Sequence, residues 1–420
     1  MSARVAITGI GVITPIAQTV SEFDEALRQG KNGFCSLENR FGEDFAIKLA
    51  AEVKDFDPLK YFADKKDAKR TDRFAQFAVA AAKTALADSG SDFEELDPYR
   101  KGILFGVGIG GLQLTLDEHS KMVERGSSRI SALYIPMMIA NMSSGAIALS
   151  LDGDDKNGFH GDNFAYCSAC ASSTHAIGEA FRKIKDGYLD VCIAGGSESV
   201  INEFALAAFN NMKALSKSDN PLRASIPFDR ERDGFVMGEG GAALVLENLD
   251  KAVARGAKIY AEIAGYGATD DGYHITAPAP DGKAAAAAMS MAVKEAGLNP
   301  SDIDYINAHG TSTPMNDRCE TAAIKLAFGE HAAKIKVNST KSMFGHMLGA
   351  AGAAEAAAVA LQIKGSYIHK TAGLTELDPE CDLDNCKDGY ENIHVRAALS
   401  NSLGFGGHNA CILIREVKNG

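Results

Sequence analysis

The chain has 420 residues, is 46% hydrophobic and 23% charged, and carries a net charge of −12 at pH 7. This length allows two or three ordinary domains or one large layered unit. The acidic balance argues against a nucleic-acid-binding protein, which needs excess Lys and Arg to neutralise phosphates. The start, MSARVAITGIGVITP, does not resemble a secretory signal, and no apolar run is long enough to span a membrane. With eight cysteines and no signal, reduced thiols and a cytoplasmic location are expected.

Short β-rich runs alternate with helical runs, which predicts an α/β fold. The clearest helices are expected at 72–89, with Thr71 as N-cap and Gly90 beyond the end, and at 283–296, closed by Gly297. Strands are expected at 5–7, 102–107, 191–194, 242–246, 259–266, 303–308, 335–338, 397–402 and 410–414.

The sequence also contains a weak internal repeat. Residues 163–199 and 334–369 each follow the plan strand, turn of small residues, helix, glycine, strand. We therefore expect two related α/β halves, 1–256 and 257–420, with a functional site in the crevice where they meet.

Cys170 is the candidate nucleophile. A strand-like run leads into a helical run at this cysteine, so the thiol should lie beside unpaired backbone N–H groups, which favour the thiolate and can stabilise an oxyanion. A buried structural cysteine is the alternative, weakened by the small flanking residues that leave room for a substrate. Cys167 and Cys170 form a C-x-x-C pair, but two ligands are too few for structural zinc, and no metal is expected.

Two histidines follow predicted strands. His309 lies in INAHGTSTPMND and His346 in NSTKSMFGHMLGAAG, with Lys341 shortly before it. Loops after strands are where α/β folds carry catalytic groups, although each histidine alone also fits an ordinary core or loop role. A GFGG turn at 404–407 can bring backbone N–H groups close to a ligand.

One glycine motif is typical of a different class of protein, the dinucleotide-binding folds. Gly106, Gly108 and Gly111 spell G-x-G-x-x-G after a predicted strand, as in dinucleotide-binding folds. The segment that follows, GLQLTLDEHSKMVERG, contains no strand that ends in an acidic residue for a ribose. A dehydrogenase is therefore not favoured.

Five motifs, in order along nearly the whole chain, resemble the type II β-ketoacyl-acyl carrier protein synthases of the thiolase-like superfamily. They are SACAS, IPFDRERDGFVMGEGGAALVLE, NAHGTSTPMND, NSTKSMFGHMLGAAGA and NSLGFGGHNA. The resemblance implies a thiolase-like fold of two pseudo-repeated α/β halves in an αβαβα layering, a homodimer and no cofactor. It implies a 3-oxoacyl synthase that condenses an acyl-enzyme thioester with malonyl-acyl carrier protein, with loss of carbon dioxide, in fatty-acid elongation.

The resemblance also implies roles for individual residues. Cys170 carries the acyl chain, while His309 and His346 bind the malonyl thioester oxygen and promote decarboxylation. Lys341 orders the two histidines and is expected to pair with Glu320. Phe405 is implied as a gate, and its N–H forms the oxyanion hole with that of Cys170. Substrate positions are implied at Ile109, Tyr134, Thr311 and Thr313, with Tyr134 reaching across the dimer. Asp317 and Glu320 are implied in the network that supports the site.

One local feature fits an acidic carrier protein. Residues 60–73 hold six basic and three acidic residues, and Lys66, Arg70 and Arg73 share a face if the stretch is helical. A basic face on an acidic protein suits such a partner, although a merely solvated surface fits the charges equally well. With the resemblance, we expect Lys66, Lys69 and Arg70 to contact the carrier.

Two features depart from the family pattern and bear on substrate range. Ser173 stands where glycine is usual, and residues 151–164 form a longer loop than usual. A type II polyketide or polyene ketosynthase is the alternative function, and His175 favours the fatty-acid members. A non-catalytic partner subunit is disfavoured because the cysteine and both histidines are retained. A thiolase is disfavoured because the GFGG turn has no cysteine, and a cysteine hydrolase needs only one histidine.

Overall fold

The computed structural model describes residues 3–151 and 158–417. Ten strands form a sheet in the order β10-β9-β13-β14-β8-β1-β7-β6-β4-β5. The first half supplies β1 (Val5–Ile13), β4 (Lys101–Gly106), β5 (Asn163–Tyr166), β6 (Val191–Glu198) and β7 (Gly240–Asn248). The second half supplies β8 (Ala261–Asp270), β9 (Tyr305–Asn307), β10 (Lys336–Asn338), β13 (Ala397–Gly404) and β14 (His408–Arg415).

The two halves share one topology. From the centre outward, β1-β7-β6-β4-β5 in the first half matches β8-β14-β13-β9-β10 in the second. In each half the first three strands pair antiparallel and the outer two add in parallel. Within the ten-stranded sheet, as far as the described residues show, the halves join through the pairing of β1 with β8, from Val5 with Ile263 to Ile7 with Ala261. The expected repeat is therefore present in the sheet, while the domain limits 1–256 and 257–420 stay a prediction.

One strand of the predicted repeat is wrong. The end of the 334–369 segment is β11 (Tyr367–Ile368), which pairs with β12 (Tyr390–Glu391) in a separate two-stranded sheet. The counterpart of β6 is instead β13, which lies much further along the chain. Local pattern could not show this, because the insertion before β13 contains short extended runs of its own.

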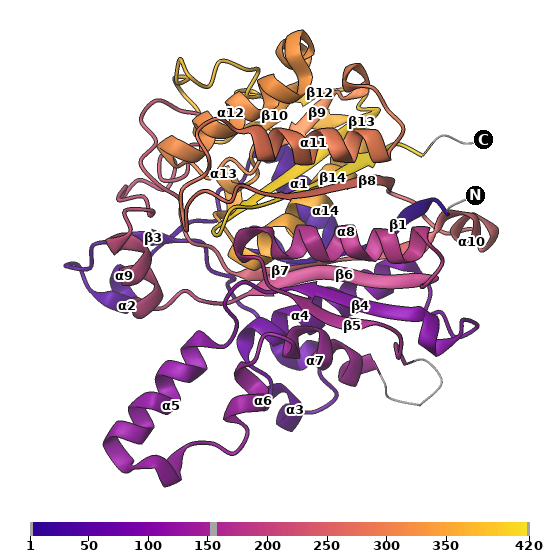
Figure 1. Cartoon of the computed structure of the whole chain (residues 1–420). Coiled ribbons are helices and arrows are strands. Elements are labelled where there is room, and N and C mark those ends of the chain that lie inside the picture. The colour runs from indigo at the N-terminus through magenta and orange to yellow at the C-terminus, as the bar shows by residue number, and fades with distance from the viewer. Residues whose placement is uncertain (1–2, 152–157, 418–420) are drawn as a thin grey trace.

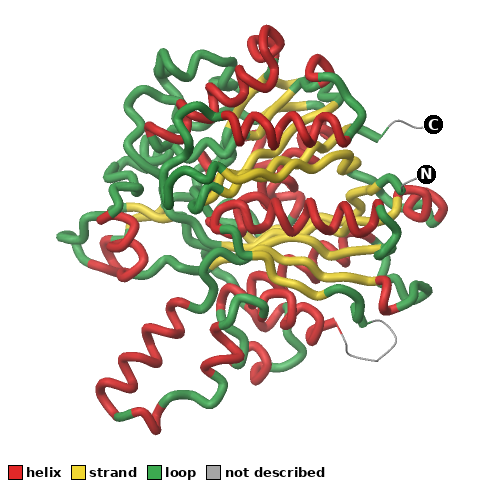
Figure 2. Tube along the Cα trace, viewed as in Figure 1, coloured by secondary structure: helices red, strands yellow, loops and turns green. Residues whose placement is uncertain are grey.

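Helices and strands alternate in five layers. In the middle, α8 (Ser172–Lys185) and α14 (Ala351–Gly365) contact strands of both halves. The outer face of the first half is covered by α4 (Arg73–Ser89) with α7 (Met142–Leu151). The outer face of the second half is covered by α11 (Lys283–Glu295), with α12 (Pro314–Phe328) beside it (Figures 1 and 2). This is the αβαβα arrangement that the resemblance implied.

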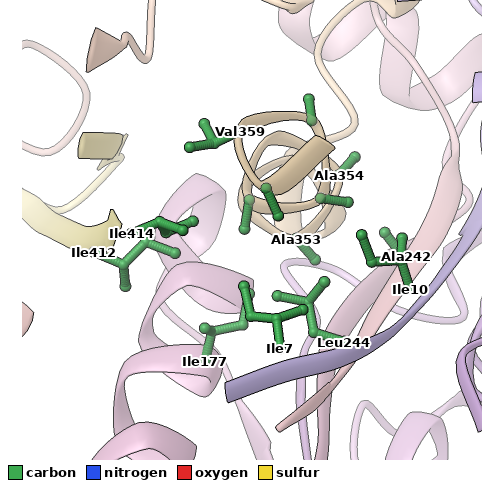
Figure 3. Close-up of a cluster of buried hydrophobic side chains, with 14 of the residues drawn as sticks. Ile7, Ile10, Ile177, Ala242, Leu244, Ala353, Ala354, Val359, Ile412 and Ile414 are labelled. Atoms are coloured by element: carbon green, nitrogen blue, oxygen red, sulfur yellow. The ribbon is translucent and has the colours of Figure 1, made fainter. Parts of the chain in front are cut away.

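The alanine-rich run of the sequence forms the central helix α14. Every residue from Ala351 to Ile363 is buried, so the helix has no solvent-facing side. Figure 3 shows this helix end-on, with Ile7 and Leu244 of the first half and Ile412 and Ile414 of the second half around it. Because alanine side chains are small, the helix is thin, and both halves of the sheet can approach it. Within 3–151 and 158–417, no helix has the length and apolar character needed to cross a membrane.

The ends of α4 show how local chemistry sets an element. The helix starts at Arg73, and the N-cap is Asp72, whose carboxylate accepts the Phe74 N–H, rather than the predicted Thr71. Thr71 instead donates its hydroxyl proton to the Asp67 carbonyl. Gly90 closes the helix with φ of 68°, as predicted.

Candidate active site

Cys170 lies where the first half turns from strand to helix. It occupies a 3-10 turn, Ala169–Ala171, that follows β5 and runs directly into α8. Ala169 has φ of 51°, which is uncommon for a residue with a side chain and marks a tight turn. The thiol is 7% exposed and lines a cavity of about 270 Å³. The sequence prediction of a cysteine at a strand-to-helix turn is therefore confirmed.

The electrostatic surroundings of this thiol differ from the sequence-based expectation. Burial raises the pKa of Cys170 to about 12, and the Glu198 carboxylate adds to the increase. The Lys341 ammonium and the backbone N–H of Phe405 act in the opposite direction. The helix terminus and its N–H groups do not outweigh burial, so the thiol is neutral in the resting protein at pH 7.

His309 and His346 of the second half face the same cavity. His309 follows β9, and His346 follows the short helix α13 (Lys341–Phe344). Their ring centroids lie 5.3 Å apart with the ring planes at 84°. The Cys170 sulfur and one nitrogen of each histidine all lie within 4.8 Å of one another. The structure thus brings together the three residues that the sequence singled out, from both halves.

Hydrogen bonds determine which nitrogen of each histidine carries the proton. Lys341 Nζ lies 3.3 Å from His309 Nδ1, and the Leu348 N–H donates to His346 Nδ1 over 3.2 Å. Because an ammonium and an amide N–H only donate, both Nδ1 atoms are acceptors. Each neutral imidazole then carries its proton on Nε2, where it can donate to a substrate oxygen. Metal ligation through Nε2 would require this proton to leave.

Both histidines are neutral at physiological pH. Burial, Lys341 and the neighbouring His346 hold the pKa of His309 well below its usual value. Burial and Lys341 do the same to the pKa of His346. Neutral Nε2–H donors can stabilise negative charge that develops on an oxygen without first having to gain a proton.

Lys341 pairs with Glu355 of α14, so the expected pairing with Glu320 is wrong. Lys341 and Glu355 are both fully buried, and the ammonium is held between this carboxylate and His309. Sequence reasoning missed Glu355, although a glutamate inside an alanine-rich buried helix is a signal, because a buried charge requires a partner.

Glu320 of α12 supports the His309 loop instead. Its carboxylate accepts the backbone N–H groups of His309 and Gly310, each over 2.8 Å, and the Asn401 side-chain amide over 3.2 Å. Burial raises the pKa of Glu320 to about 7, against the effect of these donors. Glu320 therefore acts on the loop backbone, which explains why a buried glutamate lies near His309 without contacting the lysine.

Asp317 and the two threonines complete this loop. Asp317 is buried, lies 3.2 Å from Arg232 Nε, and accepts the Phe228 N–H over 2.9 Å. Arg232 belongs to the DRERDGF motif, whose role the sequence did not reveal. The hydroxyls of Thr311 and Thr313 lie 2.8 Å apart, and both residues line the cavity.

The GFGG turn closes the cavity beside Cys170. Phe405 lines the cavity with its ring 6.3 Å from that of Phe209, and its backbone N–H faces the Cys170 thiol. A Cβ at Gly404 would come within 2.6 Å of the Ser168 carbonyl oxygen, so only glycine permits this approach. Two backbone N–H groups can thus meet an oxyanion at an acyl group on Cys170.

Two expected substrate positions lie apart from the cavity in the single chain. Ile109 is 42% exposed and is not among the residues that line the cavity. Tyr134 starts α6 (Tyr134–Met138) and bonds to Thr115 of α5 (Leu112–Arg125), in a helical pair that projects from the body in Figure 1. Their substrate roles stay a prediction.

The basic segment differs from its predicted form. It contains the short helix α3 (Lys65–Lys69) with Arg70 as C-cap, and Lys66, Lys69 and Arg70 are exposed. Arg73 belongs to α4 and pairs with Glu239 at 2.6 Å, so the predicted face of Lys66, Arg70 and Arg73 on one helix is wrong. The helical conformation is interrupted between α3 and α4, because Asp72 is the N-cap at which α4 begins.

Ser173, the unusual residue after the nucleophile, points away from the cavity. Its hydroxyl oxygen accepts the Ala353 N–H over 3.0 Å, at the start of α14, and it does not line the cavity. Its side chain therefore packs on α14, and its bearing on substrate range stays a prediction. Residues 152–157 of the longer loop lie outside the described residues.

A thiol from one half, paired Nε2–H donors from the other and backbone N–H groups beside the thiol define a carbon–carbon condensing site of the thiolase-like kind. The chain matches the models of the beta-ketoacyl synthase N-terminal domain over residues 2–252 and C-terminal domain over residues 260–375. It belongs to the β-ketoacyl synthase family.

Similar proteins agree with this membership. A relative from Synechocystis sp., named 3-oxoacyl-[acyl-carrier-protein] synthase 2, is 47% identical over 98% of both chains. One of the same name from Staphylococcus aureus is 45% identical over 98% of both chains. A solved type II polyketide acyl-carrier protein in complex with its ketosynthase is similar with a TM-score of 0.90 and 33% identity over 100% of both chains.

Proposed function

We propose that this protein is a 3-oxoacyl-[acyl-carrier-protein] synthase that extends acyl chains by two carbons in fatty-acid synthesis. The observation that carries the proposal is the placement of the Cys170 thiol opposite two histidines whose Nε2 atoms carry protons. The likeness to relatives of that name at 45–47% identity favours this activity over polyketide synthesis, where the similar structure is 33% identical.

In the first half-reaction the sulfur of Cys170 attacks the thioester carbonyl of an acyl carrier protein. The thiol proton passes to the departing carrier thiolate, since the buried thiol is neutral beforehand. The carbonyl oxygen becomes an oxyanion between the N–H groups of Cys170 and Phe405. The carbon–sulfur bond to the carrier then breaks, and the acyl group remains on Cys170.

In the second half-reaction malonyl-acyl carrier protein enters with its thioester oxygen between the two histidines. As the bond to the carboxylate breaks, the electron pair moves to the thioester as an enolate, which the Nε2–H groups of His309 and His346 stabilise. The enolate carbon attacks the acyl carbonyl on Cys170. The Cys170 thiolate then leaves and takes up one proton, which releases a 3-oxoacyl carrier protein and carbon dioxide.

We propose that the acidic carrier docks on Lys66, Lys69 and Arg70. These side chains are exposed and project from a short helix and its end on a protein of net charge −12. A double variant, Lys66→Glu/Lys69→Glu, should raise the KM for the carrier substrate about tenfold or more and leave the reaction of Cys170 with iodoacetamide unchanged. Lys283→Glu/Lys294→Glu, which replaces two exposed lysines on α11, is the charge-matched control. Equal effects of both changes would disprove the docking site.

We also propose a cytoplasmic homodimer. The strand β5 forms one edge of the sheet, and Phe164 on it is 51% exposed. An uncovered edge strand offers unpaired backbone groups to another chain. Leu149 at the end of α7 and Ile135 on α6 add exposed apolar surface in the same half. Sedimentation at micromolar concentration should give twice the chain mass, and Phe164→Lys should give the single chain.

The decisive experiment is intact-mass spectrometry after mixing the protein with a medium-chain acyl carrier protein, followed by malonyl carrier protein. The proposal requires an acyl adduct on the wild type but not on Cys170→Ala, discharged as a carrier-bound product two carbons longer. An adduct that water alone removes would indicate a hydrolase, and no adduct with any donor would indicate a silent partner subunit. Comparison of fatty and polyketide-like donors separates the two pathways.

A further inference from the structure

The glycine-rich loop after β4 binds an anion that belongs to the protein itself. The Glu198 carboxylate, at the end of β6, accepts the backbone N–H groups of Gly108 over 2.8 Å, Ile109 over 3.2 Å and Gly110 over 2.9 Å. Successive N–H groups of such a loop form an anion-binding concavity. The G-x-G-x-x-G motif is thus occupied by Glu198 where a dinucleotide fold would place a phosphate.

The same carboxylate reaches the second half of the molecule. Gly349 donates its N–H to Glu198 over 3.2 Å from the turn Leu348–Ala350, which lies between His346 and α14. The neighbouring Leu348 N–H is the donor that sets the proton position on His346. Glu198 therefore joins the loop beside Ile109 to the turn that holds the catalytic histidine.

The two loops approach too closely for any side chain between them. A Cβ at Gly349 would lie 2.2 Å from Gly108 N and 2.9 Å from Glu198 Oε2, and a Cβ at Gly108 would lie 2.7 Å from that oxygen. On its far side the loop continues to Gly111, which donates its N–H to the Met138 carbonyl of α6 over 3.1 Å. The contacts form one path from α6 to His346.

Among the described residues, no Lys, Arg or His forms a salt bridge with Glu198, so charge pairing does not account for its burial. It is fully buried, and burial raises its pKa, while the N–H groups of Gly108, Ile109, Gly110 and Gly349 act in the opposite direction. An apolar residue in its place would leave these four main-chain donors without an acceptor, so the carboxylate itself is needed to hold the two loops together.

We infer that Glu198 is a positioning residue: it holds the Gly108–Gly110 loop against the Gly349 turn and so fixes the acyl-binding side of the site relative to His346. The inference rests on the proposed condensing function and on the expected place of Ile109, a residue of this loop, at the acyl chain. It predicts that Glu198 controls which acyl chains are accepted on Cys170.

The test compares Glu198→Gln, Glu198→Asp and the control Glu262→Gln, another buried strand glutamate, which pairs with Arg4 and Arg415 far from the site. Acylation of Cys170 by short, medium and long acyl carrier proteins is followed by intact mass, and alkylation by iodoacetamide is followed against pH. In Glu198→Gln, acylation should slow by about 10- to 100-fold, because small displacements at a site are costly. The ratio between short and long donors should change by about fivefold or more.

The two Glu198 variants separate charge from geometry. Glu198→Gln removes a negative charge near the thiol, so alkylation should move to lower pH, whereas Glu198→Asp should keep the wild-type profile and still alter donor choice because its carboxylate is shorter. If the Gln variant does not fold, the Asp variant carries the test. Two results would overturn the inference. One is an unchanged ratio between short and long acyl donors in both Glu198 variants. The other is an acylation rate that falls equally for all donors in the Glu198 variants and in Glu262→Gln. A wild type that accepts no donor would overturn the proposed function instead, with the alkylation comparison still readable.

Discussion

The two halves of the molecule place their central helices at equivalent points and use them differently. In the first half, the turn after β5 carries Cys170 and leads into α8, which keeps a half-buried polar side. In the second half, the segment after β10 carries Lys341 and His346 and leads into α14, which is buried on all sides. One topology thus supplies the nucleophile in one copy and the charge-stabilising groups in the other.

Lys341 acts on the reacting groups of both halves. Its ammonium lowers the pKa of His309, His346 and Cys170 together. The lower pKa keeps both histidines neutral, whereas at Cys170 the lysine counteracts the increase in pKa that burial causes. A single cation of the second half therefore tunes both reactions, and the following changes test how far the two halves act separately.

The largest expected effect comes from Cys170→Ala. Condensation should fall by at least about 1,000-fold, since the covalent intermediate cannot form. Carbon dioxide release from malonyl-acyl carrier protein should continue, because it needs only the histidine side. Product formation by mass spectrometry and labelled carbon dioxide release measure the two steps. A parallel loss of both would show that the halves do not divide the reaction as described.

Next in size are His309→Ala and His346→Ala. Each should lower decarboxylation about 100- to 1,000-fold, the cost of losing one preorganised donor to a developing oxyanion. Acylation of Cys170 should change much less. His369→Asn replaces a buried histidine outside the cavity and serves as the control. If acylation fell as far as decarboxylation, the histidines would instead be acting as bases for the thiol.

Lys341→Met should destabilise the protein by about 3–5 kcal/mol, because it leaves Glu355 buried without its partner. The double variant Lys341→Met/Glu355→Met should recover most of that free energy of unfolding in urea, and not the activity. Recovery of activity along with stability would mean that the lysine has no role beyond its ion pair.

A smaller effect concerns pH. Since the pKa of Cys170 is raised to about 12, its thiolate fraction and its alkylation rate should increase about tenfold per pH unit between about pH 7 and 10. Decarboxylation by Cys170→Ala should stay level between about pH 6 and 8, because both histidines remain neutral there. A plateau of alkylation near pH 8 would show a thiolate that the folded protein stabilises.

Ser173→Ala should have the smallest effect. Loss of the acceptor for the Ala353 N–H at the start of α14 should cost about 1 kcal/mol of unfolding free energy. Acyl-donor preference should not change, because the side chain faces α14. A shift in donor preference would contradict this orientation.

The sequence allowed prediction of much of the fold and of the reacting residues. Cys170 and His309 could be found because each lies in a turn of small residues after a strand. His346 could be found because it lies in a similar turn, although the short helix α13 separates it from β10. The partner of Lys341 was missed. A glutamate inside the alanine-rich run was a signal, but Glu320 and Glu355 both become buried only through tertiary packing, so the local pattern does not decide between them. The pKa of the thiol was misjudged for the same reason, since burial is not visible in a local pattern. The interruption between α3 and α4 was not predicted, because it depended on whether Thr71 or Asp72 is the N-cap of α4.

The complete burial of α14 has a consequence for how the chain folds. This helix comes late in the sequence, yet strands of the first half form part of its surroundings. Until α14 is inserted, both halves of the sheet expose the apolar surfaces that flank this helix. The chain should therefore fold in one cooperative transition, and a polypeptide cut near residue 256 should give two aggregation-prone pieces that become soluble only when mixed.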